Sequence, residues 1–474
     1  MKKLNEMTIV EAARALRARE CAVRELWDAC AASAHAKNPE LHAFLELFDA
    51  DESAIAAAQK RIDANDESLL CGIPLAIKDN ILIEGKIASA ASKMLENYRA
   101  TYDAGVIKKL KNAGALFLGR TNMDEFAMGS STEHSAFGPT KNPHDTSRVP
   151  GGSSGGSSAA VAAHLCIAAL GSDTGGSIRQ PAALTGLVGL KPTYGAVSRS
   201  GLIAMGSSLD QIGPLTKTVE DARILYEAIR GIDVLDSTTI PDGLYPKKIV
   251  PEKFRIGIPD FVNKALLNSD QPFGALAKKL TDAGHTLVDI PLPMSQYALA
   301  VYYIIMPAEV STNLARLDGM RYGLSAQAGL AKHGETLLDD YINSRISGFG
   351  EETRRRILLG TFVLSSGYID AYYNKAQAVR SLLCAEYDKA FEKVDVIMTP
   401  TTLSPAFKFG EKSDPISMYL EDIFTVTANL TGMPAISVPM GTVEREGKHL
   451  PVGIHFTAPH QAENLLFEIG SCPE

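Results

Sequence analysis

Serine and lysine residues in three short segments give the first sign of chemistry in this chain. Two of the segments, residues 151–157 and 171–177, are rich in glycine and serine, and the third, residues 72–80, carries an apolar run that leads into Lys78. Acyl transfer needs an activated hydroxyl, a base to take its proton and N–H donors for the developing oxyanion. None of the three segments contains histidine. The pattern therefore predicts a serine hydrolase that uses lysine as its base.

Ser177 is the predicted nucleophile. The short apolar run Cys166–Leu170 precedes it and is typical of a buried strand, so the residues that follow are expected in the turn at the carboxyl end of that strand. Backbone N–H groups in such a turn can point at a single developing charge. We therefore expect Thr174, Gly175 and Gly176 to form the oxyanion hole.

Lys78 is the predicted base, and it is expected to act together with Ser153. It follows the apolar residues Ile73–Ile77, and a lysine held among apolar neighbours loses its charge readily because burial disfavours the ammonium. The ordinary alternative is a charged lysine on the surface. No serine in the chain has a lysine three positions later, so a Ser-x-x-Lys pair on one helix is excluded. Lys78 must reach its serine through the fold.

The glycine-serine segments have three other possible interpretations. A flexible linker is disfavoured because the apolar run Ala159–Ala163, which is typical of a buried helix, follows at once. A phosphate-binding loop would end in Gly-Lys-Ser/Thr, and neither segment does. Residues 152–156 fit the G-x-S-x-G pattern of a nucleophile elbow, but the polar residues 141–148 stand where that motif needs an apolar strand.

The runs GIPLAIKDN, GGSSGGS and GSDTGGSIRQPA resemble the amidase signature family, whose members hydrolyse amides with a Ser-cisSer-Lys triad. The resemblance implies that Ser177 is the nucleophile, that Ser153 is a bridging serine after a cis peptide bond and that Lys78 is the terminal base. It also implies an α/β fold with a large mixed β-sheet sandwiched by α-helices.

Four further segments are similar to one branch of that family, the A subunits of glutamyl-tRNA(Gln)/aspartyl-tRNA(Asn) amidotransferases. These segments are residues 123–129, 208–214, 316–323 and 359–368. The branch hydrolyses glutamine to supply ammonia, and the similarity implies that Tyr302, Arg356 and Asp422 bind the glutamine. An amino acid carries a carboxylate and an ammonium, which suit a guanidinium and a carboxylate respectively. The alternative for Arg356 is a solvated basic face, because it ends a run of three arginines.

Partners also follow from the resemblance. It implies a heterotrimer in which the B subunit binds tRNA, ATP and Mg²⁺ and a small C subunit clamps the other two together, with no cofactor or metal held by this chain. The formal net charge of −8 agrees that this chain alone is a poor nucleic-acid binder. A stand-alone amidase acting on a small or fatty amide remains the second hypothesis, and a catalytically inactive scaffold the third.

Composition is consistent with a cytoplasmic enzyme, or one of an organelle matrix. The 474 residues are 45% hydrophobic, the longest apolar stretch is too short for a membrane span, and the N-terminus has no apolar core typical of a signal peptide. The six cysteines show no metal-binding spacing and are expected to be free thiols. No linker or repeat marks a boundary, so we expect a single amidase domain over residues 1–474.

Helical and extended segments alternate along the chain. Thr8–Glu11 is a capping box that predicts a helix with Ile9, Ala12, Ala13 and Leu16 on one face. The further strand candidates are Ile73–Ile77, Ala115–Leu118, Arg255–Ile258, Val394–Met398, Ala435–Val438 and Val452–Phe456. This alternation predicts an α/β sheet covered by helices, with a strand order that the sequence does not reveal.

Overall fold

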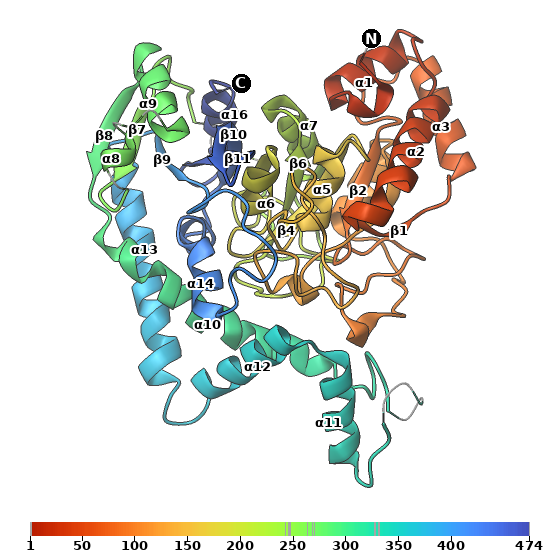
Figure 1. Ribbon diagram of the computed structural model, residues 1–474, viewed down its shortest axis with the longest axis vertical. Helices are drawn as coiled ribbons and strands as arrows, with labels where there is room; N and C mark the ends of the chain where they lie inside the picture. Colours follow the sequence, from red (N-terminus) through yellow and green to blue (C-terminus); the bar gives the residue numbers. More distant parts are fainter. Residues whose placement is uncertain are drawn as a thin grey trace.

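One mixed β-sheet organises the computed structural model, which describes residues 2–473 except 242, 245–247, 263, 268, 270, 327–328 and 330–331 (Figure 1). Within those residues the sheet has eleven strands, in the spatial order β1 (Phe44–Leu47), β3 (Leu116–Thr121), β2 (Pro74–Lys78), β4 (Ala168–Asp173), β6 (Gln211–Thr216), β5 (Val188–Lys191), β10 (Ala435–Arg445), β11 (Lys448–Thr457), β9 (Val396–Pro400), β7 (Arg255–Pro259) and β8 (Thr286–Ile290). The strands β3, β2 and β4 run parallel, as do β9, β7 and β8, and the remaining neighbours are antiparallel. The predicted α/β fold with a mixed sheet is confirmed.

The α-helices are α1 (Ile9–Arg17), α2 (Val23–Leu41), α3 (Glu52–Asp63), α4 (Gly105–Asn112), α5 (Gly155–Ala162), α6 (Arg179–Thr185), α7 (Val219–Ile229), α8 (Lys264–Leu267), α9 (Pro272–Asp282), α10 (Ala298–Asn313), α11 (Leu337–Gly348), α12 (Glu351–Val363), α13 (Lys375–Ala390), α14 (Pro415–Tyr419), α15 (Val426–Leu430) and α16 (Glu463–Gly470). The connections β2–α4–β3 and β3–α5–β4 run in opposite directions along the sheet. Because such crossovers are right-handed, α4 and α5 cover opposite faces. Helix α4 packs on α7, and α5 packs on α6.

Predicted elements agree with the structure apart from their ends. The Thr8 hydroxyl accepts the Glu11 N–H at 3.1 Å and the Glu11 carboxylate accepts the Thr8 N–H at 2.8 Å, so the capping box begins α1 as predicted. Every strand candidate overlaps an observed strand. The helix predicted from Ala159 begins earlier, at Gly155, and a Cβ at Gly155 or Gly156 would collide with Thr132 or with the Asn122 backbone. Only glycine lets the first turn of α5 pack so closely.

Helices α10, α12 and α13 pack together, since α10 contacts both of the others, and with α11 they lie along the left and lower sides of the molecule in Figure 1. In that view α11 and α12 make up the lower end of the molecule, and both chain termini lie at the upper end. Among the residues that the structure describes, no helix is both long enough and apolar enough to cross a bilayer. All six cysteines are free thiols, as predicted. The expectation of a single domain over 1–474 stays a prediction.

Candidate active site

Lys78 is the last residue of β2, and its side chain is completely buried. The parallel strands β2 and β4 end side by side, which places the lysine next to the residues that end β4. Its Nζ lies 2.8 Å from Ser153 Oγ, 2.8 Å from Ser154 Oγ and 2.9 Å from Ser172 Oγ. The structure therefore brings the predicted base and the predicted bridging serine into contact, and a surface position for Lys78 is excluded.

Burial lowers the pKa of Lys78 to about 7, even though the charges of Asp124, Asp173 and Asp210 act to raise it. Taking an ammonium out of water costs more free energy than these carboxylates restore. At neutral pH a large share of the Lys78 amine is consequently unprotonated.

The Ser172 carbonyl oxygen also accepts from the Lys78 amine, at 3.2 Å. Ser154 Oγ donates to the Ser172 carbonyl oxygen at 3.1 Å, and Ser172 Oγ accepts from Asn80 Nδ2 at 2.9 Å. Both hydroxyl oxygens can accept from the amine, as the Ser172 carbonyl does, so the two N–H groups of a neutral Lys78 have partners apart from Ser153. The lone pair of the neutral amine can then accept from the Ser153 hydroxyl. Sequence reasoning had missed Asn80, Ser154 and Ser172, although all three lie inside the segments that it singled out.

Ser153 lies in a fully buried loop just before α5. The peptide bond between Gly152 and Ser153 is cis. The Ser153 carbonyl oxygen accepts the Asp124 N–H at 3.2 Å, and Asp124 in turn accepts the Thr132 N–H at 2.9 Å. These bonds fix the loop in place, so a flexible linker is excluded.

Ser177 lies in the turn that follows β4, as predicted, and its side chain is 6% exposed. Asp173, at the end of β4, accepts the N–H groups of Gly176 at 2.9 Å and Ile178 at 3.1 Å. Burial would raise the pKa of Asp173, but its ion pair with Arg179 holds that pKa well below its usual range. A permanent carboxylate thus shapes the turn on both sides of the serine.

The loop that carries Ser153 and the turn that carries Ser177 meet through the backbone, since the N–H of Ser154, the next residue after Ser153, donates to the Ser177 carbonyl oxygen at 3.1 Å. Among the described residues, no hydrogen bond joins the side chains of Ser177 and Ser153. Gly176 has a φ of +141°, a conformation that favours glycine and that turns the chain just before the nucleophile.

The N–H groups predicted to form the oxyanion hole differ in whether they already have a hydrogen-bond acceptor. The Gly176 N–H is already bonded to Asp173, whereas the described structure assigns no acceptor to the N–H groups of Gly175 and Ser177. The Thr174 hydroxyl donates to Asp210 at 2.7 Å, which anchors the start of the turn. The geometry therefore favours the Gly175 and Ser177 N–H groups over that of Gly176 as donors to an oxyanion.

Arg356 lies on the inner face of α12, and it is 3% exposed. Its Nε donates to Glu352 at 2.8 Å, and its guanidinium lies over the rings of Tyr303 and Tyr419, 5.5 and 5.4 Å from their centroids. Burial disfavours the charge, but Tyr303 and Glu352 outweigh it and raise the pKa of Arg356. The solvated basic face is therefore excluded for Arg356, and it describes only its exposed neighbour Arg354.

Asp422 is buried, and three neutral donors surround it. One oxygen accepts from Ser130 Oγ at 2.8 Å and Gln180 Nε2 at 2.7 Å, and the other accepts from the Tyr303 hydroxyl at 2.6 Å. Burial raises the pKa of Asp422. Tyr303, which the sequence did not single out, thus contacts both charged groups, whereas the predicted Tyr302 packs edge-on against Tyr303.

The charged residues and the serine turn belong to one site. Gln180, three residues after Ser177, bonds Asp422, and the Thr425 hydroxyl donates to the Gly175 carbonyl oxygen at 2.5 Å. The Tyr302 hydroxyl lies directly against Gly175, where a Cβ would come within 2.6 Å of it. Arg356 lines a cavity of about 220 Å³. Tyr302 and Asp422 therefore lie beside the turn that carries Ser177, whereas Arg356 is joined to them through Tyr303.

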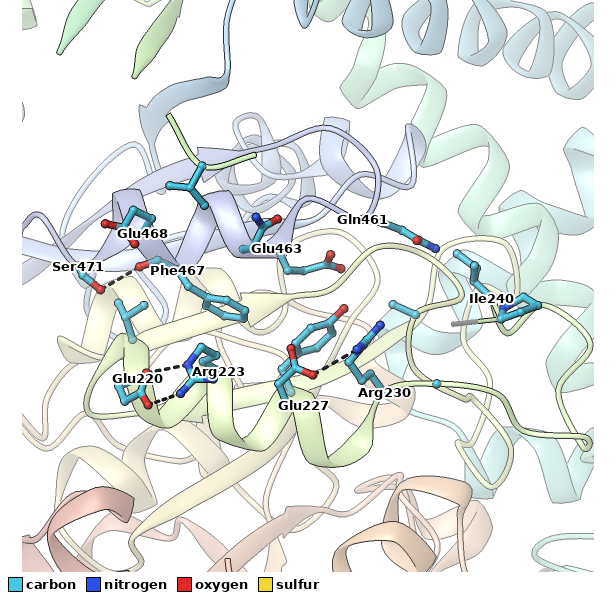
Figure 2. Close-up of a pocket in the computed structure, with 17 residues that line it drawn as sticks. Glu220, Arg223, Glu227, Arg230, Ile240, Gln461, Glu463, Phe467, Glu468 and Ser471 are labelled. Carbon is cyan, nitrogen blue, oxygen red and sulfur yellow. Dashed lines mark hydrogen bonds and ion pairs between the residues drawn. The ribbon is translucent and has the colours of Figure 1, made fainter. Parts of the chain in front are cut away.

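A second cavity lies between α7 and α16 (Figure 2), and Lys78, Ser153 and Ser177 do not line it. It measures about 370 Å³, and its charged residues are mostly paired on α7 itself, Arg223 with Glu220 and Arg230 with Glu227. No serine–lysine pair lines it. We therefore assign the candidate active site to the serine turn.

A mixed α/β sheet with a buried Ser-Ser-Lys arrangement at the ends of its strands defines a class, the serine amidases. A family model for amidases matches residues 25–467, and the chain belongs to the amidase family.

Named relatives narrow the comparison. The chain is 48% identical to the A subunit of glutamyl-tRNA(Gln) amidotransferase from Desulfatibacillum aliphaticivorans over 98% of this chain and 96% of that protein, and 53% identical to the A subunit from a Nitratiruptor species over 84% and 88%. Among solved structures, it resembles the A subunit from Thermotoga maritima with a TM-score of 0.76 at 40% identity, covering 98% and 93% of the two chains. It also resembles a peptide amidase of Stenotrophomonas maltophilia with a TM-score of 0.79 at 27% identity, covering 99% and 96%.

Proposed function

We propose that this chain is the glutamine-hydrolysing subunit of a tRNA-dependent amidotransferase. The observation that carries the proposal is the buried pair of charged residues beside the serine turn, Arg356 and Asp422. A free amino acid offers one carboxylate and one ammonium, and these two residues match both. The identity to proteins named as A subunits of glutamyl-tRNA(Gln) amidotransferase, over nearly the whole chain, points the same way.

In the proposed reaction, Ser177 Oγ bonds to the side-chain amide carbon of glutamine, and its proton passes through the Ser153 hydroxyl to the neutral Lys78 amine. The oxyanion that forms accepts from the free N–H groups of the turn. The Lys78 ammonium then returns the proton through Ser153 to the leaving nitrogen, and the C–N bond breaks to release ammonia. Water, deprotonated by the same route, cleaves the glutamyl ester and releases glutamate.

Glutamine recognition in this proposal divides between two partners. The guanidinium of Arg356 binds the α-carboxylate, because Glu352 takes its Nε and only the weak acceptor Met306 Sδ, at 3.6 Å, contacts its Nη1. Asp422 binds the α-ammonium, with Tyr303 holding the carboxylate in position. Tyr302 lines the same wall of the site.

Partners complete the proposed activity. Free ammonia becomes ammonium in water and loses its lone pair, so an enclosed transfer to a second protein chain is required. We propose that this second chain is the B subunit, which binds tRNA, ATP and Mg²⁺. It converts Glu-tRNA(Gln) to Gln-tRNA(Gln), Asp-tRNA(Asn) to Asn-tRNA(Asn), or both. The C subunit completes a heterotrimer in the cytoplasm or an organelle matrix.

The stand-alone amidase remains the alternative. Fold alone does not separate the two functions, because the TM-scores to the Thermotoga A subunit and to the peptide amidase are nearly equal. Sequence identity favours the amidotransferase, at 40% against 27%. A neutral amide would also offer no charged group to Arg356 and Asp422, whereas glutamine offers one to each.

The test is rescue by ammonium. A reconstituted complex that carries Ser177→Ala should make no Gln-tRNA from glutamine, yet it should make Gln-tRNA at the wild-type rate from ammonium chloride, since the activation step is proposed on the B subunit. If ammonium fails to rescue it, the chain does more than supply nitrogen. If glutamine still supports the variant, the assignment of the nucleophile is wrong.

A further inference from the structure

Helix α11 has its apolar side turned outward. Its buried positions Asp340, Ser344 and Gly348 recur at intervals of four residues, whereas Leu338, Ile342 and Ile346, at the same spacing, are exposed. Leu338 is the most exposed of these three side chains, at 65%. A helix on the surface of a globular protein normally shows the reverse arrangement.

Polar contacts explain why the inner side of α11 cannot be apolar. Asp340 accepts the Gly334 N–H at 2.7 Å, and Ser344 Oγ accepts the Ala326 N–H at 3.2 Å. The Gly348 carbonyl oxygen accepts from Ser92 Oγ at 3.0 Å. These bonds fix which side of the helix faces the protein, so the apolar side chains must face outward.

Helix α12 shows the same inversion. Its inner side carries Glu352, Arg356 and Gly360, while Leu358 (70% exposed) and Phe362 lie on the outer side. The apolar surface continues beyond the helix, because the ring of Phe362 contacts those of Tyr368 and Tyr372, at centroid distances of 4.5 and 5.9 Å. We call the exposed side chains of this region the outer apolar face: Leu338, Ile342, Ile346, Leu358, Leu359, Phe362, Tyr368 and Tyr372.

An exposed apolar surface of this kind marks a site of interaction. We propose, on the basis of the function proposed above, that the outer apolar face is the docking surface for the partner chain that receives the ammonia. Relatives over nearly the whole chain are named as the A subunit of an amidotransferase, so a partner chain is expected. Two features place the ammonia-receiving chain, rather than another copy of this one, on this face.

The first feature is that α12 has the docking surface on one side and the glutamine site on the other. Arg356 and Glu352 point into the site, and Gly360 packs against α10 so closely that a Cβ would collide with the Pro307 carbonyl oxygen. Helix α10 carries Tyr302 and Tyr303. A partner on the outer apolar face therefore sits against the helix that holds the α-carboxylate end of the proposed glutamine site.

The second feature is a cavity of about 330 Å³ at the edge of this face, lined in part by Leu364 and Tyr373. Glu309 also lines it, and its carboxylate accepts the Ser208 N–H at 2.9 Å. The loop that holds Ser208 leans on the serine turn, since a Cβ at Gly206 would meet the Thr174 side chain at 3.3 Å. One short loop thus separates the active-site turn from a hollow beside the proposed partner.

The experiment measures binding of the full chain to its cognate B and C subunits, purified as a complex. The double variant Leu358→Glu/Phe362→Glu places two charges on α12, and Ile342→Glu/Ile346→Glu does the same on α11. The matched control is Val234→Glu/Ile249→Glu, because these side chains are 95% and 92% exposed outside the outer apolar face. We expect each test variant to raise Kd at least tenfold, with no change for the control, and we expect all three to hydrolyse glutamine as the wild type does.

Unchanged affinity of the α12 variant would overturn the proposal, and unchanged affinity of the α11 variant would remove α11 from the face. A wild-type chain that forms a dimer which the α12 variant dissolves would also overturn it, because a second copy would then occupy the surface. A different result would contradict the proposed function itself, namely a wild-type chain that does not hydrolyse glutamine. If the α12 variant also loses glutamine hydrolysis, its change has disturbed the glutamine site. The affinity of the α11 variant then decides the proposal, because α11 carries no residue of that site.

Discussion

The site contains two buried cations that the protein treats in opposite ways. Lys78 is surrounded by serine hydroxyls and a carbonyl oxygen, and burial brings its pKa down to about 7. Arg356 lies between two tyrosine rings with Glu352 bonded to its Nε, and its pKa is raised. Burial acts against the charge in both places.

The difference lies in the partners. Hydroxyl groups solvate an amine without offsetting the loss of water, whereas a carboxylate and aromatic faces stabilise a guanidinium that cannot give up its proton. Lys78 is therefore suited to proton transfer, and Arg356 is suited to holding an anion. The contrast teaches that burial alone assigns no role, and that the neighbouring groups do.

The largest effect is expected at the residues that carry out the reaction, which we call the reacting side, as opposed to the binding side that holds glutamine. Ser177→Ala removes the attacking oxygen, so kcat for glutamine hydrolysis should fall by about 10⁴-fold or more. The matched control is Ser158→Ala, which removes a buried hydroxyl that bonds only the Gly155 carbonyl oxygen within α5. The rate of glutamate release measures both. Comparable losses in the two variants would indicate a general defect of the fold around α5.

The binding side should show a smaller and selective effect. A hydrogen bond to a charged group contributes about 1.5–3 kcal/mol, so Arg356→Ala should lower kcat/KM for glutamine by roughly ten- to a hundredfold or more. Asp422→Ala should do the same, and hydrolysis of a neutral aliphatic amide should scarcely change. Arg354→Ala, on the exposed side of the same helix, is the control. Equal losses on glutamine and on the neutral amide would mean that Arg356 and Asp422 support the fold.

The neutral state of Lys78 predicts an acid limb in the pH profile. Its pKa is lowered from 10.5 to about 7, so the folded protein holds the neutral amine above about pH 7 and takes up a proton below it. We expect kcat/KM to fall roughly tenfold per pH unit below about 7. Lys191 is the control, since burial also lowers its pKa to about 7 and its amine bonds only the Pro192 carbonyl oxygen. If the acid limb disappeared in Lys191→Met, the limb would report the titration of Lys191 and not that of Lys78.

The same shift links pH to stability. Between about pH 7 and 10.5 the unfolded chain binds a proton at Lys78 that the folded chain does not, so the free energy of unfolding should rise with pH across this window. Below about pH 7 both states are protonated, and the cost of the buried charge is carried in full.

The smallest effect is expected at Tyr303. Tyr303→Phe removes one hydrogen bond to Asp422, which Ser130 and Gln180 continue to hold, so KM for glutamine should rise only about two- to tenfold with little change in kcat. Tyr302→Phe tests the neighbouring ring, and Tyr368→Phe on the surface is the control. If Tyr302→Phe raised KM more than Tyr303→Phe, the order of the two tyrosines inferred from the structure would be reversed.

Much of the reacting side could be predicted from the sequence because its parts are local. An apolar run that ends in Lys78 predicts a buried strand, and a second such run before Ser177 predicts the turn at the end of another. Parallel strands that end side by side then bring the two segments together. The free N–H groups could not be predicted, because the bond between Gly176 and Asp173 depends on the detailed shape of the turn.

The binding side could not be derived from local pattern. Arg356 and Asp422 lie on different elements, and only the family resemblance marked them. Tyr303 escaped notice because it stands beside Tyr302 in an apolar helix, where either ring could face inward. The packing of α12 against α10 decides between them, and that packing depends on Gly360.

The most direct test of the account is to trap the acyl-enzyme. The wild-type chain, mixed with glutamine, quenched in acid and digested, should carry one glutamyl group on the peptide that contains Ser177. Arg356→Ala should be labelled much less at the same glutamine concentration, while a neutral aliphatic amide should acylate both proteins equally. Two results would contradict the claim that the neutral Lys78 and the charged Arg356 serve one glutamine site. One is a glutamyl group on any other residue, and the other is equal labelling of the two proteins by glutamine.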